Sequence, residues 1–323
     1  MKTLTVTMIL AGALGTAHAG GRGLVENPDL LNSLRDHPFV FEYIDERKPV
    51  FENALPCQER PGYRFAESLF EEEVAGVGFS ANVAGSVGLV IEGANLGADA
   101  SLGPSVTVFG QTATPIEVRL GARHSTVTGE NSLDFGIYAF DTEIDSFQYA
   151  NTPAPIDVDE SFGWTLPGAM EGLSAGDSID CGAGCTLAWD ISATAVADLA
   201  AILKFRIDPS GIETRVFTVS NAYAALSATG TLTKSWVDWQ VEGGGHLDIM
   251  RLAFGARGLI TFNGEKWVAD SGASLAVTDI MNGSASLDIP DWIPWVPDDY
   301  TVFELEGPED YSNSWSYLCT FGY

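Results

Sequence analysis

The sequence predicts a mainly β fold, with long antiparallel strands in a sandwich or an elongated closed sheet and a short N-terminal helical segment. Apolar side chains occupy every second position over residues 199–207, an alternation typical of a strand. Residues 208–211 (Asp-Pro-Ser-Gly) are a turn sequence, so we expect residues 212–226 to return as the partner strand. Residues 193–203 also suit a helix by propensity, but the alternation that continues from them into the turn favours a strand.

A second hairpin is predicted between residues 247–262 and residues 265–277. Asn263-Gly264 separates the two segments, and this dipeptide supplies both positive-φ residues of a type I′ turn. Residues 83–100 consist mainly of Gly, Ala, Ser and Val, and such small side chains suit closely stacked sheets. Shorter strands are expected at residues 105–109, 115–120 and 133–140.

The chain divides into three parts by composition. We expect residues 1–19 to be a signal peptide and residues 20–62 to be a helical and irregular N-terminal segment. A short helix is predicted over residues 28–36, because an Asn-Pro pair supplies its N-cap and first residue. The β domain covers residues 63–323, and residues 145–181, rich in Pro, Gly, Asp and Ser, predict a long loop or a boundary between sheet halves.

The N-terminus has the three regions of a secretory leader. Lys2 gives a basic start, residues 4–14 are mostly apolar, and a small-x-small site ends at Ala19. We therefore expect cleavage after Ala19 and a mature protein that is extracellular, periplasmic or on the cell surface. A buried N-terminal helix is the alternative interpretation of the apolar run.

The chain is strongly acidic, with 44 Asp and Glu against 16 Lys and Arg and a formal net charge of −28. Such a surface repels nucleic acid and anionic lipid headgroups, so nucleic acid is excluded as a partner. The same charge suits a medium of high salt or one containing divalent cations.

Four cysteines in an exported chain predict disulfides. Three pairings are possible, and the glycine-rich spacing between Cys181 and Cys185 favours a local bridge between those two. Cys57 and Cys319 would then join the start of the domain to its end. Half of a metal site is the rival interpretation of the Cys181–Cys185 spacing.

One pair of residues has the composition of a catalytic unit. On a strand, His246 and Asp248 point to the same face, so that the carboxylate could orient the imidazole. This pair is the weak catalytic candidate of a secreted hydrolase, with a nucleophile supplied from elsewhere in the fold. The alternative is a polar pair on the solvated face of a strand.

An acidic segment is a candidate calcium site. Asp157, Asp159 and Glu160 place oxygen ligands close together, as a calcium loop does. The EF-hand pattern fails, because Phe162 and Gly168 stand where the turn glycine and the bidentate acid belong. Calcium is therefore a candidate cofactor, and an acidic surface loop is the alternative.

The densest aromatic segment contains Trp292, Trp295 and Tyr300. If exposed, these rings could stack on sugar rings or anchor a protein partner. If buried, they would cap one end of the sheet core, stiffened by the prolines between them.

Aromatic side chains alternate to the end of the chain at Trp315, Tyr317, Phe321 and Tyr323, with Cys319 among them. This pattern resembles the closing strand of bacterial outer-membrane β-barrels, and the resemblance implies a membrane-embedded barrel. The four cysteines and the first mature residues depart from that family. The alternative is a final strand paired into a soluble sheet and joined to it through Cys319.

These observations predict an exported, non-catalytic surface, structural or binding protein, assisted by calcium if the acidic segment binds it. A protein or a glycan is the expected partner. The alternatives are an outer-membrane β-barrel, a β-pore-forming protein that inserts its long small-residue strands, and a secreted hydrolase. A membrane partner belongs only to the barrel and pore alternatives.

Overall fold

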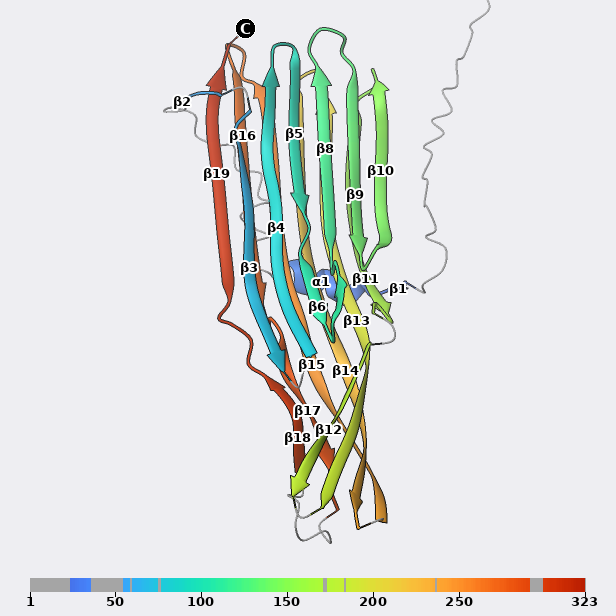
Figure 1. Cartoon of the computed structure of the whole chain (residues 1–323). Helices are drawn as coiled ribbons and strands as arrows, with labels where there is room; N and C mark the ends of the chain where they lie inside the picture. The colour runs from blue at the N-terminus through green and yellow to red at the C-terminus, as the bar shows by residue number, and fades with distance from the viewer. Residues whose placement is uncertain are drawn as a thin grey trace, which may run out of the picture.

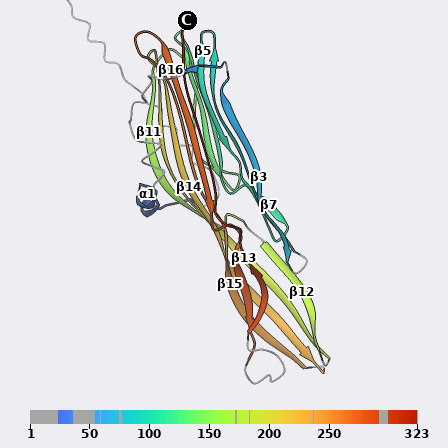
Figure 2. The same cartoon turned by 90° about the vertical axis from the view of Figure 1, so that its left-hand side faces the viewer.

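The protein is a two-sheet β-sandwich that continues at one end into a long, twisted extension (Figures 1 and 2). The computed structural model describes residues 24–35, 55–58, 60–74, 77–170, 173–182, 184–235, 237–290 and 299–322. Within these ranges the chain forms nineteen strands and one helix, so the predicted mainly β fold is confirmed. The leader predicted over residues 1–19 lies outside the described residues.

Every described strand belongs to one of two sheets. The larger sheet contains, among the described residues, the strands β1 (Val25–Glu26), β2 (Leu55–Pro56), β11 (Ile156–Pro167), β12 (Leu173–Gly182), β13 (Cys185–Asp208), β14 (Gly211–Lys234), β15 (Val237–Phe262), β16 (Trp267–Thr278), β17 (Asn282–Asp288), β18 (Asp299–Leu305) and β19 (Tyr311–Phe321). The smaller sheet contains, in the same part of the chain, β3 (Gly62–Val74), β4 (Val77–Glu92), β5 (Asn95–Leu102), β6 (Ser105–Val108), β7 (Gln111–Ala113), β8 (Glu117–Ser125), β9 (Asn131–Ala139) and β10 (Thr142–Thr152).

The two sheets are separate layers. The smaller sheet has the order β10-β9-β8-β5-β4-β6-β7 with β3 beside β4, and the larger sheet is built around β11-β13-β14-β15-β16-β19. No backbone pairing between described strands joins one sheet to the other. Of the two predicted architectures, the sandwich is therefore present and the closed sheet is not.

Three strands set the length of the molecule. β13, β14 and β15 contain 24, 24 and 26 residues. At about 3.3 Å per residue each spans roughly 80 Å. Their upper halves face the smaller sheet, and their lower halves continue with β12, β17 and β18 as the extension (Figures 1 and 2). The residues 193–203, ambiguous by sequence, lie in the middle of β13 as predicted.

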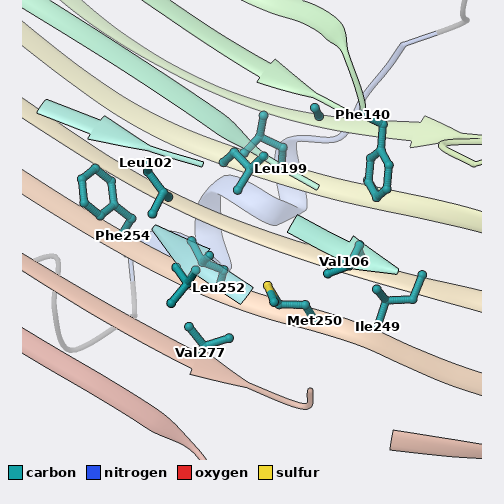
Figure 3. Packing of buried hydrophobic residues seen from close by; sticks show 14 of the residues in the cluster. Leu102, Val106, Phe140, Leu199, Ile249, Met250, Leu252, Phe254 and Val277 are labelled. Atoms are coloured by element: carbon teal, nitrogen blue, oxygen red, sulfur yellow. The ribbon is translucent and has the colours of Figure 1, made fainter. Parts of the chain in front are cut away.

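The core lies between the two sheets. Phe135 of β9 and Phe205 of β13 meet across the layers with ring centroids 5.0 Å apart. Gly258 of β15 lies so close to the smaller sheet that a Cβ atom there would stand 2.7 Å from the Cβ of Ala98. Figure 3 shows the same close packing of Leu102 from the smaller sheet beside Phe254 of the larger one. Small side chains thus allow the layers to approach, as the composition predicted.

Aromatic rings close one open side of the sandwich. Tyr63 of β3 stacks on Trp315 of β19 at 6.2 Å between ring centroids, and its hydroxyl accepts a hydrogen bond from the Asn313 side chain at 2.8 Å. Next to this contact, Cys57 and Cys319 form a disulfide that links the chain before β3 to the last strand. This is the pairing that the sequence favoured. The alternating aromatic residues of β19 therefore face the interior of the sandwich beside β16.

The predicted short helix is present as α1 (Pro28–Arg35) and covers the outer face of the larger sheet. Leu30 and Leu31 pack there against Ala200 and Phe217. The backbone N–H of Asn27 donates to the carbonyl of Gly163 at 2.8 Å. The helix is thereby attached to β11, which lies between the short edge strand β1 and β13 in that sheet.

The long loop predicted over residues 145–181 is wrong. β10, β11 and β12 occupy most of this segment. The sequence obscures them because Asp145 and Glu160 stand at inward-facing positions, opposite the buried residues Ile137 and Leu203, and interrupt the apolar alternation. Along the chain, β10 is the last strand of the smaller sheet, and β11 and the strands after it belong to the larger sheet.

The predicted hairpin around Asn263-Gly264 is present, but its type I′ turn is wrong. β15 ends at Phe262 and β16 begins at Trp267, so four residues connect them. Of the two predicted turn residues, Gly264 alone has a positive φ. The Asn263 side chain accepts the backbone N–H groups of Glu265 and Lys266 at 3.0 and 2.9 Å, and these bonds stabilise the wider loop.

Candidate functional site

A broad groove lies on the outer face of the smaller sheet, the face turned away from the sandwich core. It has a volume of about 1010 Å³ and crosses β3, β4, β5 and β8, which lie side by side in Figure 1. The side chains of these strands alternate, so the apolar ones enter the core and the small or polar ones form the groove. A smaller hollow beside it shares Arg64 and Ser86 with the groove and extends it along the same strands.

Glycines keep the floor of the groove low. In the strand register Gly62 lies opposite Gly88, Gly88 opposite Asp99, and Asp99 opposite Gly121. Gly121 lies beyond the residues that line the groove, and a Cβ atom there would contact only the Asp99 carboxylate, at 3.6 Å. The side chain of Arg123 lies directly over Gly97. The uncovered backbone of the floor is therefore the part at Gly62 and Gly88, which a ligand can approach closely.

Three arginines border the groove, and two of them are ion-paired. Arg60 pairs with Glu92, and this hydrogen bond holds the pKa of the Glu92 carboxyl below its usual value. Arg123 binds the Asp99 carboxylate through both terminal nitrogens, at 2.6 and 2.9 Å. Arg64 forms no ion pair with any described residue. It is an exposed cation on the wall of the groove, free to bind an anionic group.

Side-chain contacts also fix the positions of residues next to the groove on the outer face of the smaller sheet. The hydroxyls of Ser86 and Ser101 are hydrogen-bonded at 2.8 Å across β4 and β5. Arg119 of β8 is paired with Glu117, which raises the pKa of its guanidinium, and lies 5.4 Å from the ring centroid of Tyr138. These contacts hold the side chains around the groove in set positions before any ligand arrives.

The catalytic candidates form a pair but not a catalytic constellation. His246 Nε2 and Asp248 Oδ1 are 2.8 Å apart on β15, as the shared face predicted. This is the only hydrogen bond of the His246 side chain among the described residues, and the imidazole is 57% exposed. Both residues lie in the extension, on a different sheet from the groove, so they take no part in it.

The three acidic calcium candidates do not converge. Asp157 and Asp159 lie on the exposed face of β11, opposite Arg206 and Lys204 of β13. Glu160 lies on the other face of the strand, opposite the buried Leu203. Within the described ranges no group of three or more His, Cys, Asp or Glu side chains is arranged to hold a metal ion. The pairing of β11 with β13, which the sequence alone does not specify, thus places a basic side chain opposite each of the two aspartates.

The structure describes only some of the aromatic residues and cysteines that the sequence singled out. Trp292 and Trp295 lie outside the described residues. Tyr300 is half-buried in β18 and packs against the core, away from the groove. Cys185 is disulfide-bonded, and the side chain of Cys181 lies outside the described part of the chain.

Asp145 is the described carboxyl group with the most perturbed proton affinity. It lies on β10 at the open side of the sandwich that β10 and β11 border. The pKa of Asp145 is raised to about 6, chiefly by partial burial and also by the nearby charges of Glu160 and Glu143, while the hydrogen bond from the Ser146 N–H opposes the rise. Inward-pointing acids at a sheet edge discourage edge-to-edge pairing with another chain.

We expect Asp145→Asn to stabilise the protein above pH 7. A carboxyl whose pKa is raised on folding stabilises the fold below about pH 4, and this stabilisation is lost as the pH rises through about 6. With a discount for solvent screening, the variant should gain about 1–2 kcal/mol at pH 8 and little at pH 4. Urea denaturation at both pH values measures the difference. Asp134→Asn, an exposed site on β9, is the control, and an equal gain in both variants would contradict the assignment.

The groove could not be predicted from the sequence. Its basic residues give no signal there, because the four of 16 that lie between residues 60 and 123 are close to the average density of the chain. The convergence of Arg60, Arg64 and Arg123 depends on the pairing of β3 with β4 and of β5 with β8. Local patterns do not specify that pairing.

Comparisons with known proteins add no family. No protein-family model matches the sequence, and a search of curated proteins finds no match. The fold alone therefore defines the class, an all-β sandwich with a disulfide of the kind that oxidising compartments permit. In the described part of the chain, no helix is both long and apolar enough to cross a lipid bilayer.

Proposed function

We propose that this chain is an exported, non-catalytic binding protein that presents the groove of its smaller sheet to a ligand. The observation that carries the proposal is the groove itself. It combines about 1010 Å³ of space, open glycine backbone at Gly62 and Gly88, and Arg64, a cation with no ion pair among the described residues, on a chain where acids outnumber bases almost three to one. Concave sites with a few placed polar groups are the usual form of ligand sites.

Export is supported by two independent features. The N-terminal residues have the regions of a secretory leader with a cleavage site after Ala19. The Cys57–Cys319 disulfide is compatible with an oxidising compartment outside the cytoplasm.

Binding without catalysis is supported by the chemistry of the groove lining. The acids Glu92 and Asp99 are each held by an arginine, and such pairs hold side chains in place rather than transfer protons. The buried His124 is turned toward Asn131, to which its Nδ1 is hydrogen-bonded at 2.7 Å. The protein thus resembles a rigid receptor surface carried on a long β scaffold.

Fractionation tests this proposal. The full chain is expressed with its own leader in a double-membraned bacterium, and the intact mass of the product is measured in each fraction. We expect a periplasmic or released protein that begins at Gly20 and contains no free thiol. Recovery in the cytoplasm with the leader attached would refute export, and recovery only in detergent would refute a soluble binding protein.

A further inference from the structure

The groove also indicates the chemistry of its ligand. On the basis of the function proposed above, we propose that the groove binds a short saccharide that carries one carboxylate group, with the carboxylate at Arg64 and the sugar hydroxyls over the glycine floor. Three features of the groove lead to this class of ligand: its balance of charge, its hydroxyl and amide lining, and its shape.

The charge balance favours a single anionic group. The lining contains three arginines and three acids, and the arginines Arg60 and Arg123 are already paired with Glu92 and Asp99. The third acid, Glu130, lies beyond β8 and accepts a hydrogen bond from the Thr128 hydroxyl at 3.1 Å, on the other side of the groove from Arg64 on β3. Arg64 remains as the cation without a described acidic partner. A guanidinium matches the geometry of a carboxylate through two parallel hydrogen bonds. A polyanion would instead be repelled by the rest of a chain with net charge −28.

The rest of the lining suits hydroxyl groups. Beyond the charged pairs, polar groups from four strands and one loop surround the floor. These residues are Ser86, Asn95, Ser125, Thr128 and Ser132, with Asn151 at the far end. Hydroxyl and amide side chains both donate and accept hydrogen bonds, as sugar hydroxyls do. The paired Arg123 guanidinium has five N–H donors in all, so it keeps donors beyond those bound to Asp99 and the Ala122 carbonyl.

The shape suits a short chain of rings. The groove runs across the strands from Arg64 on β3 to Ser132 on β9, with β4, β5 and β8 between them. Four strand spacings of about 4.8 Å make this distance roughly 19 Å. Between Arg64 and the Asp99–Arg123 pair, the floor at Gly62 and Gly88 carries no side chain that would hold a flat ring away from the backbone.

Titration calorimetry with matched saccharides tests the inference. Each pair contains a neutral disaccharide and its counterpart ending in glucuronate, galacturonate or mannuronate, and inorganic phosphate is titrated separately. We expect at least one uronate to bind about 10-fold or more tightly than its neutral partner, since a hydrogen bond to a charged group contributes that factor. Arg64→Gln should abolish the preference, and phosphate alone should bind weakly.

Two glycine variants show where the saccharide binds. Gly88→Leu places a side chain on the floor of the groove and should abolish binding. A Cβ atom there stands 3.3 Å from the Pro61 carbonyl oxygen, so circular dichroism of the variant checks that the sheet remains folded. Gly78→Leu is the matched control, because Gly78 lies on β4 outside the groove with open space around its Cα. It should bind like the wild type.

The outcomes separate this inference from the proposed function. No binding of any uronate by the wild-type protein, an unchanged preference in Arg64→Gln, or phosphate binding as tight as that of the uronates overturns the saccharide inference. If neutral and acidic sugars bind equally and Gly88→Leu removes both, the groove remains a binding site, but the role of Arg64 is refuted. Failure of the proposed function would appear in the fractionation, which requires no ligand.

Discussion

Replacing both Cys57 and Cys319 with alanine should lower the free energy of unfolding by about 4–5 kcal/mol. The two residues are 262 positions apart, so the disulfide closes a loop that contains nearly the whole β domain. In the chain-entropy model, the stabilisation from a cross-link grows with loop length and reaches about 4–5 kcal/mol for loops of this order. Urea denaturation of the variant and of the oxidised wild type measures the difference.

The single variant Cys57→Ala provides the control for side-chain volume. It removes the disulfide but keeps the sulfur of Cys319, which is fully buried in β19. We expect it to lose nearly as much stability as the double variant, because the cross-link is absent from both. A loss below about 1 kcal/mol in both variants would show that the contacts of β3 with β19 hold the sandwich closed without the disulfide.

Phe205→Ala should destabilise the protein by about 3–5 kcal/mol, the usual cost of removing a buried phenyl ring. Phe205 lies on β13 of the larger sheet and is fully buried. Its ring contacts Phe135 and Phe147 of the smaller sheet, at centroid distances of 5.0 and 6.5 Å. The substitution therefore leaves a cavity between the layers and removes contacts that join them. Urea denaturation of the variant is the measurement.

A double-mutant cycle with Phe135→Ala tests the sandwich contact itself. Because the two rings touch, the cycle should give a coupling energy of about 0.5–1.5 kcal/mol. Phe205→Ala combined with Phe303→Ala is the control pair, since Phe303 packs against Phe79 and Phe109 near the extension. Additive losses for Phe135 and Phe205 would contradict the arrangement of the two sheets.

Several elements could be predicted from local sequence, because local physics decides them. The alternation over residues 199–207 specifies a strand with one buried face, and β13 has that face. The Asn27-Pro28 pair specifies the start of α1. In these cases the side-chain period or the cap chemistry acts within a few residues, so no tertiary contact is needed to predict the element.

Other elements could not be predicted, because they depend on contacts distant in sequence. Apolar and polar side chains alternate in the same way in a sandwich and in a closed sheet. Only the pairing of the strands distinguishes the two architectures. β10 and β11 were missed since Asp145 and Glu160 interrupt their inward faces at the open side of the sandwich. Asp157 and Asp159 lie opposite basic residues, and this too depends on the register between β11 and β13.

The groove shows the same limit for function. Its floor is formed by residues of neighbouring strands, and Gly62, Gly88 and Asp99 have no special spacing in the sequence. The aromatic and acidic clusters could be identified from the sequence because their members are neighbours in the chain. The groove could not, because strand pairing brings its residues together from distant parts of the chain.

Uronate titration of Gly88→Leu beside Gly78→Leu tests most directly the central claim that the outer face of the smaller sheet is a binding surface. Both variants place the same side chain on β4, and only the first lies in the lining of the groove. We predict that Gly88→Leu loses saccharide binding while Gly78→Leu retains the wild-type affinity. Equal binding by the two variants would contradict the claim and place the ligand elsewhere on the protein.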